Sequence, residues 1–362
     1  MAISQGSTIR IEPQPAQDPV DHRRIQAAID VLAEQGGGTV QLASGIYVVD
    51  APIRLRSHVT LAGDPNAPPV IRKGAAWRAQ LVVDADYGER EIQVDNAEGA
   101  RVGMAVSVHD DGSDDWLVST AIVTRIEGRT LYLDRRLVHD YDCERGGVVS
   151  SASSLVEAIQ AEDVALRHLV VDGGGGHDFL TGCRGGAVYL YETRNSWIES
   201  LEVRNFSGDG ISWQITDGIA VADCRVHHCS RYGLHPGTGA WHTVVRDCEC
   251  DYNGSDGLYL CWRVQGGLFE ANRLHDNAGF GVSIGHKDRE NQFTGTEIWG
   301  NARGGILFRE EKESNGAHGT VFGRTVNRDN GGPDMSMRGT HHGVVIDGVD
   351  GPSTAEHDPE NR

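Results

Sequence analysis

The chain has 362 residues, 47 of them glycine, and a formal net charge of −19. This acidity argues against nucleic acid and anionic membranes as partners, because both are negatively charged. An acidic or neutral sugar is not excluded, since a local basic groove can lie on an acidic protein. The N-terminus lacks the basic and apolar stretches of a secretory signal, which predicts a cytoplasmic protein as written, or a secreted one if a signal was removed.

The first 75 residues are predicted to hold a capping helix and the first strands of a repeat. Residues 21–35 have a helical apolar stripe, with Asp21 as the expected N-cap and glycines at the end. A helix here would cover the open end of a solenoid, whose strands would otherwise expose unpaired backbone groups. Residues 76–150 interrupt the repeat and read as a small inserted β subdomain.

Residues 151–350 are predicted to form the main repeat, and 351–362 a polar, disordered tail. Glycines recur about every 24 residues, each followed by an aliphatic residue or alanine, and the apolar positions then alternate with a step of two. The glycines are Gly186, Gly210, Gly233, Gly257, Gly281 and Gly305. The pattern predicts an all-β fold, a parallel β-helix with rungs of about 24 residues.

Two further ladders support the same period. Asn253, Asn277 and Asn301 are 24 residues apart, and asparagine tolerates left-handed backbone, which predicts a stacked corner between two sheets. An inward ladder is expected at Val226, Cys250, Leu274 and Ile298. Repeated glycine, corner asparagine and inward aliphatic residues therefore agree on one solenoid.

The seven cysteines are an odd number and are predicted to be free thiols in a reducing compartment. Cys224 and Cys248 lie one period apart and are expected to stack in the core. A zinc site made of Cys248, Cys250 and His227 or His228 is the alternative.

Side chains two and four residues after each glycine are expected to face outward, beginning with Val188 and Leu190. With the turns that follow, they would form a strip of aromatic, histidine and charged residues that suits sugar rings, unless it is an ordinary solvated face. The predicted substrate-binding residues are Glu192, Gln214, Tyr259, Trp262, Arg263, His286, Lys287, Arg309 and Glu310.

The segment SRYGLHPGTGAWHTVVRDCECDYNGSDGL, followed by FEANRLHDNAGFGV, resembles the β-helix module of mannuronan C5-epimerases. Most of the chain is similar to the wider pectin-lyase-like superfamily, which implies a right-handed β-helix. The epimerase signature is Tyr-Gly-x-Asp-Pro-His, whose Tyr, Asp and His take part in proton transfer at the sugar C5. Tyr232 and Pro236 match it, whereas His235 replaces the aspartate and Gly237 the histidine. Gly279 stands where the family has an arginine.

GFGVSIGHK is more distantly similar to the Gly-His-Gly-x-Ser-Ile-Gly segment of polygalacturonases, with Phe280 in place of the histidine. Asp256 falls near one of that family's acidic residues, and Ser255 replaces its paired aspartate. The resemblances therefore imply a carbohydrate-active enzyme and leave its reaction open.

Three functions follow from these residues. The first is β-elimination or epimerisation of a uronic-acid sugar, with Tyr232 and a neutral His235 as acid and base. Its carboxylate clamps would be Lys287, Arg263 or Arg309.

The second function is glycoside hydrolysis or transglycosylation by Asp209 and Asp256, two rungs and about 9.6 Å apart. That separation is near the upper limit for an inverting pair of carboxyls. The third is a non-catalytic glycan-binding or structural solenoid. The substrate or partner in each case is a poly- or oligosaccharide, and the sequence does not indicate an oligomeric state.

No cofactor is predicted. The acidic run DDGSDD at residues 110–115 has the oxygen ligands that Ca²⁺ prefers, but a solvated loop is the favoured interpretation.

Overall fold

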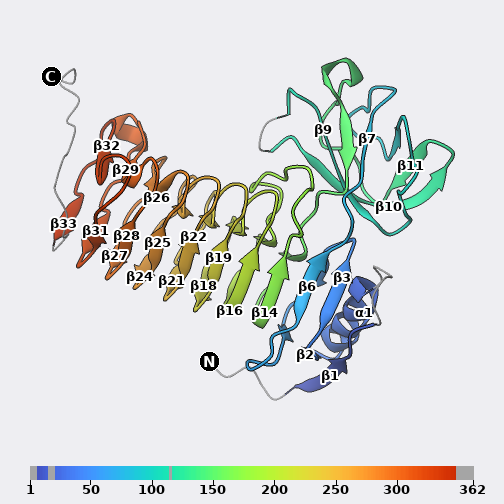
Figure 1. Ribbon diagram of the computed structural model, residues 1–362, viewed down its shortest axis with the longest axis horizontal. Helices are drawn as coiled ribbons and strands as arrows, with labels where there is room; N and C mark the ends of the chain where they lie inside the picture. The colour runs from blue at the N-terminus through green and yellow to red at the C-terminus, as the bar shows by residue number, and fades with distance from the viewer. Residues whose placement is uncertain (1–5, 15–20, 114–115, 348–362) are drawn as a thin grey trace.

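A computed structural model describes residues 6–14, 21–113 and 116–347. It shows a long stack of parallel strands, with helix α1 (Asp21–Glu34) at the N-terminal end and a separate antiparallel unit beside the first rungs (Figure 1). The expected tail at 351–362 lies outside the described residues. Within the described part, nothing helical has the length and apolar character needed to cross a bilayer.

Two parallel sheets form the walls of the stack. One sheet contains β4 (Ile53–Leu55), β13 (Val156–Ile159), β15 (Val188–Tyr191), β17 (Ile211–Gln214), β20 (Leu234–Pro236), β23 (Leu258–Tyr259), β26 (Phe280–Ile284), β29 (Gly304–Phe308) and β32 (Met335–Met337). We call this the nine-stranded sheet.

The second sheet contributes two strands to most rungs. Its strands are β1 (Ser7–Ile11), β2 (Gly38–Leu42), β3 (Ile46–Val49), β5 (Val59–Ala62), β6 (Val70–Lys73), β14 (Ala165–Asp172), β16 (Arg194–Arg204), β18 (Asp217–Ala222), β19 (Arg225–His227), β21 (Val244–Arg246), β22 (Glu249–Asp251), β24 (Leu268–Glu270), β25 (Arg273–His275), β27 (Gln292–Thr294), β28 (Glu297–Trp299), β30 (Val321–Gly323), β31 (Val326–Asn327) and β33 (Val345–Asp347). One rung thus runs through β17, β18 and β19 before the next begins with β20.

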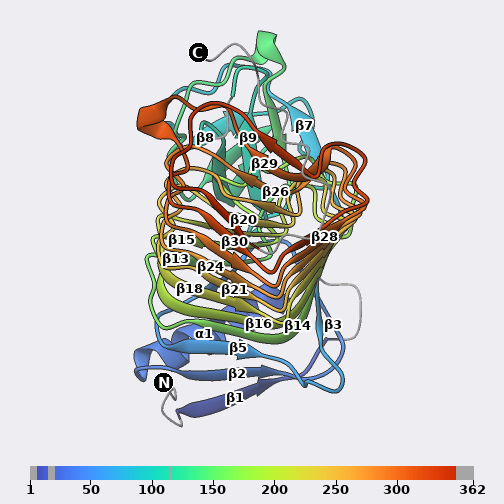
Figure 2. The ribbon, with the colours of Figure 1, turned by 90° about the vertical axis from the view of Figure 1, so that its left-hand side faces the viewer.

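The register follows the period of the sequence. Ile211 pairs with Leu234, and Leu234 with Leu258, along the nine-stranded sheet. Val226 pairs with Cys250 on the other sheet, which confirms the expected inward ladder. The coils seen end-on in Figure 2 enclose a continuous apolar core, so each rung buries its apolar side chains against its neighbours.

The N-terminal helix closes the first coil. Ile25, Ile29 and Leu32 are fully buried, and α1 packs against β2, β3 and β4. This confirms the predicted capping helix.

The antiparallel unit has its own sheet and core. Its strands are β7 (Arg78–Gln80), β8 (Glu91–Gln93), β9 (Ala105–His109), β10 (Ser119–Glu127), β11 (Thr130–Leu133) and β12 (Val148–Ser150). Arg184 Nε donates to the carbonyl of Trp116 at 2.8 Å and so links this inserted subdomain to the loop before β15.

The asparagine ladder is present, but its backbone geometry differs from the expectation. Asn277 donates from Nδ2 to Asn301 Oδ1 at 2.9 Å and accepts from the Asn253 N–H at 3.1 Å. The left-handed residue is the one before each asparagine, such as Tyr252 (φ 53°) and Asp276 (φ 52°). The asparagines are therefore inward caps that satisfy corner backbone groups, not the turn residues themselves.

The first regular rung is shifted by one residue from the predicted phase. Val188 pairs with Ile211, which places Ala187, not Gly186, opposite Gly210. Val188 and Leu190 consequently point into the core, where both are buried. The physical reason is the side-chain alternation of a strand, in which a one-residue shift exchanges the two faces. The expectation that these two residues face outward was wrong.

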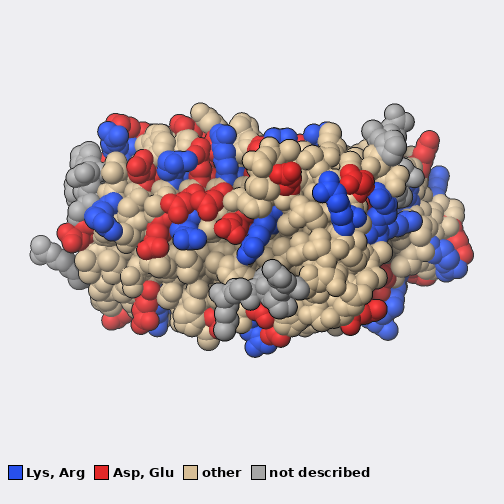
Figure 3. Space-filling view, turned by 90° about the horizontal axis from the view of Figure 1, so that it is seen from below, with Lys and Arg blue, Asp and Glu red and all other residues tan. Residues whose placement is uncertain are grey.

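All seven cysteines are thiols. Apart from Cys143, none of them belongs to a group of possible metal ligands in the described part of the chain, so the alternative zinc site at Cys248 and Cys250 is not formed there. Cys248 and Cys250 are buried in the core, while His228 is exposed. The face seen in Figure 3 mixes Lys and Arg with Asp and Glu, without a large area of one sign.

Candidate active site

The outer face of the nine-stranded sheet gathers most of the predicted catalytic residues. Ile211, Leu234 and Leu258 are paired on three neighbouring strands, β17, β20 and β23. The residue two positions before each of them is Asp209, Tyr232 and Asp256, respectively. His235 lies on β20 and Tyr259 on β23, in the next outward positions. Strand alternation therefore brings these five side chains to one face.

Asp209 and His235 form a buried pair. His235 Nδ1 lies 2.5 Å from Asp209 Oδ2, and neither residue is more than 1% exposed. Burial opposes a charge on the imidazole, but the Asp209 carboxylate and the Cys261 thiol outweigh it and raise the pKa of His235 to about 9. His235 is thus an imidazolium at neutral pH, and the expected role of neutral base does not fit its surroundings.

The loop of residues 173–186 covers this pair, and we call it the covering loop. The Gly182 carbonyl accepts from Ser212 Oγ at 2.7 Å and from Gln214 Nε2 at 3.2 Å. A methyl group on Gly182 would collide with Asp209 and His235, so only glycine lets the loop approach so closely.

Gln214 was predicted to bind substrate, but it serves the fold. Its side chain is fully buried, donates to the covering loop and accepts from the Thr238 N–H at 2.7 Å. It therefore has no exposed surface to offer a sugar.

Tyr232 and Tyr259 stack face to face. Their ring centroids lie 4.1 Å apart with an interplanar angle of 2°. Arg231 lies over the Tyr232 ring at 4.7 Å, and Arg309 lies over the Tyr259 ring at 4.5 Å. Burial raises the pKa of Tyr232 to about 12, so its phenol keeps its proton at neutral pH.

Asp256 is a buried carboxyl among arginines. Its Oδ1 accepts from the Phe280 N–H at 2.7 Å, and it is 6% exposed. Burial raises its pKa to about 6, against the opposing effect of Arg309, Arg303 and Arg231. A carboxyl with such a pKa exchanges protons readily near neutral pH.

Arg309 reaches across two rungs. Its guanidinium donates to Ser283 Oγ at 3.0 Å and to the Leu260 and Cys261 carbonyls at 2.7 Å each. Asp288, fully buried, lies 3.3 Å from the same guanidinium. Arg309 is still 19% exposed along its side chain, so part of its charge faces solvent.

The other predicted binding residues lie at the turns beyond this sheet. Trp262 is 48% exposed and lies 4.8 Å from the His286 ring, and His286 Nδ1 lies 3.3 Å from Glu311. Lys287 is half-buried, with left-handed backbone (φ 57°), whereas Glu310 is exposed. These residues border the face without joining the Tyr232 cluster.

A groove of about 780 Å³ runs along the turns that follow β4, β13, β15, β17, β20 and β23. It includes two predicted binding residues, Glu192 and Arg263, together with the 49% exposed Trp241. Its full lining is Ser57, Gln160, Ala161, Glu162, Glu192, Arg194, Ile215, Thr216, Asp217, Gly239, Trp241 and Arg263. An exposed aromatic ring among charged groups suits a saccharide chain.

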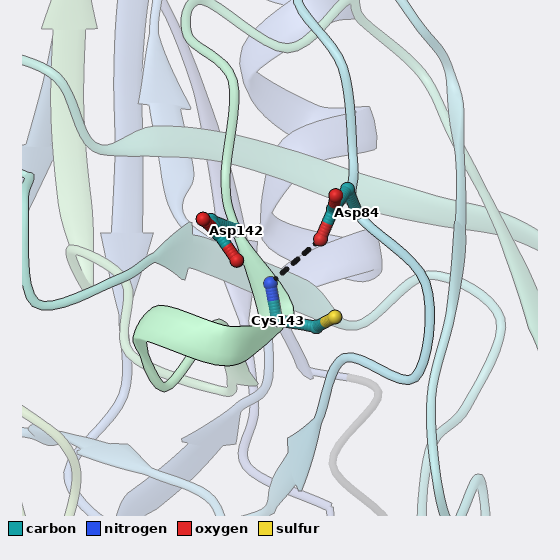
Figure 4. Close-up of side chains that lie close together, drawn as sticks. All are labelled: Asp84, Asp142 and Cys143. Atoms are coloured by element: carbon teal, nitrogen blue, oxygen red, sulfur yellow. Dashed lines mark hydrogen bonds between the residues drawn. The ribbon is translucent and has the colours of Figure 1, made fainter.

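Two groups of potential metal ligands lie away from this face. One is Asp84, Asp142 and Cys143 in the inserted subdomain (Figure 4). Asp84 Oδ1 accepts from the Cys143 N–H at 2.9 Å, and Asp142 Oδ1 caps the turn by accepting from the Glu144 N–H at 2.7 Å. The other is Glu249, Asp251 and His275. Both carboxylates of this second group pair with arginines, so hydrogen bonds and ion pairs account for the two groups.

The acidic run at 110–115 is only partly described, because residues 114 and 115 lie outside the described ranges. Asp110 is buried rather than solvated as expected. It accepts from the Gly112 N–H at 2.9 Å and the Asp142 N–H at 3.0 Å and pairs with Arg145. It holds its own loop together.

Arg231, Arg303 and Trp241 escaped the sequence prediction, whereas Cys261 was expected on the outward strip and Asp288 near it, both without a role. Arg231 and Arg303 occupy equivalent positions three rungs apart, which was a usable signal. The approach of Cys261 to His235 had no such signal, because it depends on side-chain reach between rungs.

Comparisons with known proteins agree with this architecture. Residues 17–235 match the family described as rhamnogalacturonase A/epimerase, pectate lyase-like, and residues 179–322 match the right-handed β-helix region. No curated protein sequence matches the chain.

Among solved structures, the chain is similar to the A-module of a mannuronan C-5 epimerase from Azotobacter vinelandii. The identity is 19% and the TM-score 0.62, over 91% of this chain and 71% of the other. A polygalacturonase from Erwinia carotovora is 11% identical with a TM-score of 0.56, over 97% and 95% of the two chains. The ORF18 protein of Geobacillus virus E2 is 12% identical with a TM-score of 0.58, over 90% and 53%. These likenesses concern the fold.

Proposed function

Because the chain belongs to the rhamnogalacturonase A/epimerase, pectate lyase-like family, we propose that it is a carbohydrate-active enzyme that acts on a uronic-acid sugar of a poly- or oligosaccharide. The proposed reaction begins with removal of the proton at C5, as in epimerases and lyases. The substrate lies across the outer face of the nine-stranded sheet, and the groove beside it holds the neighbouring sugars.

The observation that carries the proposal is the set of arginines around Asp256 and the tyrosine stack. Arg231, Arg303 and Arg309 all act on the Asp256 carboxyl, on a chain whose net charge is −19. Such a local concentration of positive charge suits an anionic substrate on an otherwise acidic protein. A uronate carboxylate near Arg309 would be neutralised, which makes the C5 proton more acidic.

The two proton carriers of the proposed reaction are Asp256 and Tyr232. Asp256, with a pKa of about 6, is largely ionised at neutral pH and takes the C5 proton. Tyr232, whose pKa is about 12, keeps its proton and donates it. Donation to C5 from the other side of the sugar gives the epimer, whereas donation to the leaving glycosidic oxygen gives elimination and an unsaturated end.

The buried pair of Asp209 and His235 has an indirect part in this scheme. It places an imidazolium 5.4 Å from the Tyr232 ring and 5.3 Å from the Tyr259 ring, measured between centroids. The pair as a whole is neutral, so its part is to pack edge-on against the two tyrosine rings with its imidazolium end.

The groove supports a polymeric substrate. Trp241 offers an aromatic face, and Glu192, Arg194, Asp217 and Arg263 line the same space with groups that can bind hydroxyls and carboxylates. A chain of sugars would then contact the turns of successive rungs.

Glycoside hydrolysis is the second candidate, because a carboxyl with a raised pKa, such as Asp256, is also what a glycosidase uses as its acid. Its expected partner, Asp209, is buried beneath the covering loop and paired with His235. Asp288 is likewise buried against Arg309. The geometry favours proton abstraction for this reason.

The test is a product assay on a panel of polyuronates and neutral glycans in D₂O. Deuterium at C5 without chain cleavage identifies epimerisation, and new ultraviolet absorbance from unsaturated ends identifies elimination. Asp256→Asn should lower kcat by about 10²-fold or more, the usual contribution of a general base. Arg309→Gln should raise KM for polyuronates.

Arg273→Gln on β25 is the matched control, because Arg273 is an exposed arginine of the other sheet, paired with Glu249. It should leave both constants unchanged. New reducing ends with neither deuterium at C5 nor ultraviolet absorbance would overturn the proposal in favour of hydrolysis. Saccharide binding without turnover would favour a glycan-binding solenoid.

A further inference from the structure

Cys261 lies at the end of a diagonal of polar side chains across three neighbouring rungs. Asp209, on the first rung, accepts from His235 Nδ1, on the second, at 2.5 Å. Cys261, on the third, interacts with the other side of the imidazole, whose Nε2 is buried and makes no well-formed hydrogen bond. Thiol, imidazole and carboxylate in this order are the arrangement of an activated cysteine nucleophile.

The surroundings of Cys261 favour a thiolate. Gly237 and Gly285 occupy the equivalent positions on the rungs either side, and there the Gln214 amide and the Arg309 guanidinium fill the space of the missing side chains. Arg309 also donates to the Cys261 carbonyl at 2.7 Å. Cys261 thus lies between an amide and a cation.

The groups that face the Cys261 thiol act in both directions. A hydrogen bond with Cys183, together with His235 and Arg309, outweighs burial and lowers the pKa of Cys261 to about 4. Asp288 and Tyr259 are the acidic groups on the same face, and they act against its ionisation. The hydrogen bond with Cys183 and the cationic neighbours prevail, and Cys261 is a partly exposed residue, which leaves an approach for a small reagent.

The covering loop supplies a second sulfur. Cys183 hydrogen-bonds with Cys261 through its side chain. Its backbone is fixed, because its N–H donates to Thr181 Oγ1 at 3.2 Å and its carbonyl accepts from Tyr189 Oη at 2.8 Å. Two thiols from segments far apart in the sequence, one of them activated, make a pair that oxidation can join.

We propose that Cys261 is a modification site for peroxides and that Cys183 resolves the product into a disulfide. The Cys261 thiolate attacks the peroxide oxygen and breaks the O–O bond, which gives a sulfenic acid and an alkoxide or hydroxide that takes up a proton. The Cys183 sulfur then loses its proton and attacks the sulfenic sulfur, so that an S–S bond forms and water leaves. In sum, two thiols are oxidised to a disulfide, and the peroxide is reduced to an alcohol or water, with a second water formed.

The disulfide would tie the covering loop to the turn after β23, over the pair of Asp209 and His235. This chemistry is independent of the proposed sugar reaction, because it needs only the two sulfurs, the imidazolium and a peroxide.

Cys143 provides an internal control. It is also half-buried, but Asp84 raises the pKa of its thiol. The other five cysteines are Cys183, Cys224, Cys229, Cys248 and Cys250, and they are buried.

The experiment is alkylation of the whole protein with iodoacetamide at pH about 6 to 8, read for each cysteine by peptide mass spectrometry. Cys261 should react at a rate nearly independent of pH, whereas Cys143 should react faster by about tenfold per pH unit, as its thiolate fraction grows. His235→Asn should make Cys261 pH-dependent. If the alkylation rate of Cys261 in the wild type rose with pH in parallel with that of Cys143, Cys261 would not be a thiolate at neutral pH. This outcome is decisive even if His235→Asn does not fold.

Hydrogen peroxide then tests the second step. It should yield a peptide pair that links Cys183 with Cys261, while Cys183→Ser should leave a sulfenic acid on Cys261 that dimedone captures. A disulfide between other cysteines, or wild-type protein that keeps both thiols in peroxide, would refute the pairing.

Discussion

The asparagine ladder gives a direct test of what holds the corners of the β-helix. Asn277 accepts from the Asn253 N–H at 3.1 Å and from Asn253 Nδ2 at 3.0 Å. It donates to the Cys250 and His275 carbonyls at 3.0 Å each and to Asn301 Oδ1 at 2.9 Å. Asn277→Ala removes all five hydrogen bonds from a corner where Asn277 and Asn253 are 1% exposed.

The expected loss follows from what remains unpaired. The buried Asn253 N–H loses its acceptor, which costs about 1–3 kcal/mol, and each other lost hydrogen bond contributes about 0.5–1.5 kcal/mol net. We therefore expect Asn277→Ala to lower the free energy of unfolding by about 3 kcal/mol or more, the sum of the lower limits of these contributions. Asn277→Asp keeps the acceptor but turns a charged oxygen toward three oxygens, so it should be no better tolerated than alanine.

Urea unfolding followed by circular dichroism measures the loss, and amide hydrogen exchange of Asn253 locates it. Asn66→Ala, at an exposed asparagine, should change stability by less than about 0.5 kcal/mol. If Asn277→Ala cost no more than that control, or if Asn253 kept its protection, the ladder would not be what pairs the corner backbone.

Two further predictions concern the covering loop and the buried pair. Gly182→Ala should destabilise the protein by about 1–3 kcal/mol, because its methyl group would collide with Asp209 and His235, whereas Gly323→Ala meets nothing within 4 Å and should be neutral in urea unfolding. Since the folded pKa of His235 is raised from 6.5 to about 9, its pair with Asp209 should contribute stability that is full below pH 6.5 and lost as pH rises through about 9. In Cys261→Ser no thiolate titrates against this loss, and it should occur at a lower pH than in the wild type, because the thiol also helps to raise the pKa of His235. Asp209→Asn should abolish the loss in urea unfolding, and a loss that persists with Asp209→Asn would contradict the assignment.

The fold was largely predictable because every rung of a solenoid has the same structural requirements. Each rung needs an apolar inward row and a corner that satisfies its backbone, so glycine, asparagine and aliphatic residues recur with the period of the coil. The prediction was wrong at the first regular rung, where Ala187 rather than Gly186 stands opposite Gly210. There the rung from Ala187 to Gly210 spans 23 residues, so a count of 24 back from Gly210 falls on Gly186, one residue too early.

The candidate site was predictable in its position and only partly in its contacts. The period alone puts Asp209, Tyr232 and Asp256 in one row, and the register has them there. It could not show that Asp209 pairs with His235 or that Gln214 is buried, because both depend on a covering loop without a repeat. Strand alternation predicts whether a side chain points inward or outward, but its contacts on the outer face also depend on the covering loop.

The residues on the outer face of the nine-stranded sheet differ in how far the covering loop buries them. Asp209 and His235 are sealed beneath Gly182, whereas Tyr259, Cys261 and Arg309 are half-buried at its open side. A sealed ion pair cannot touch a sugar, and its two charges cancel overall, but its dipole lies in a water-poor setting, where it acts strongly on its nearest neighbours. Tyr232 and Asp256 keep 9% and 6% of their surface exposed, so they belong with the groups able to meet a substrate, and the buried pair acts on all of them from behind. A substitution in the pair should therefore alter the pH dependence of the accessible groups, and one at Arg309 should alter binding itself.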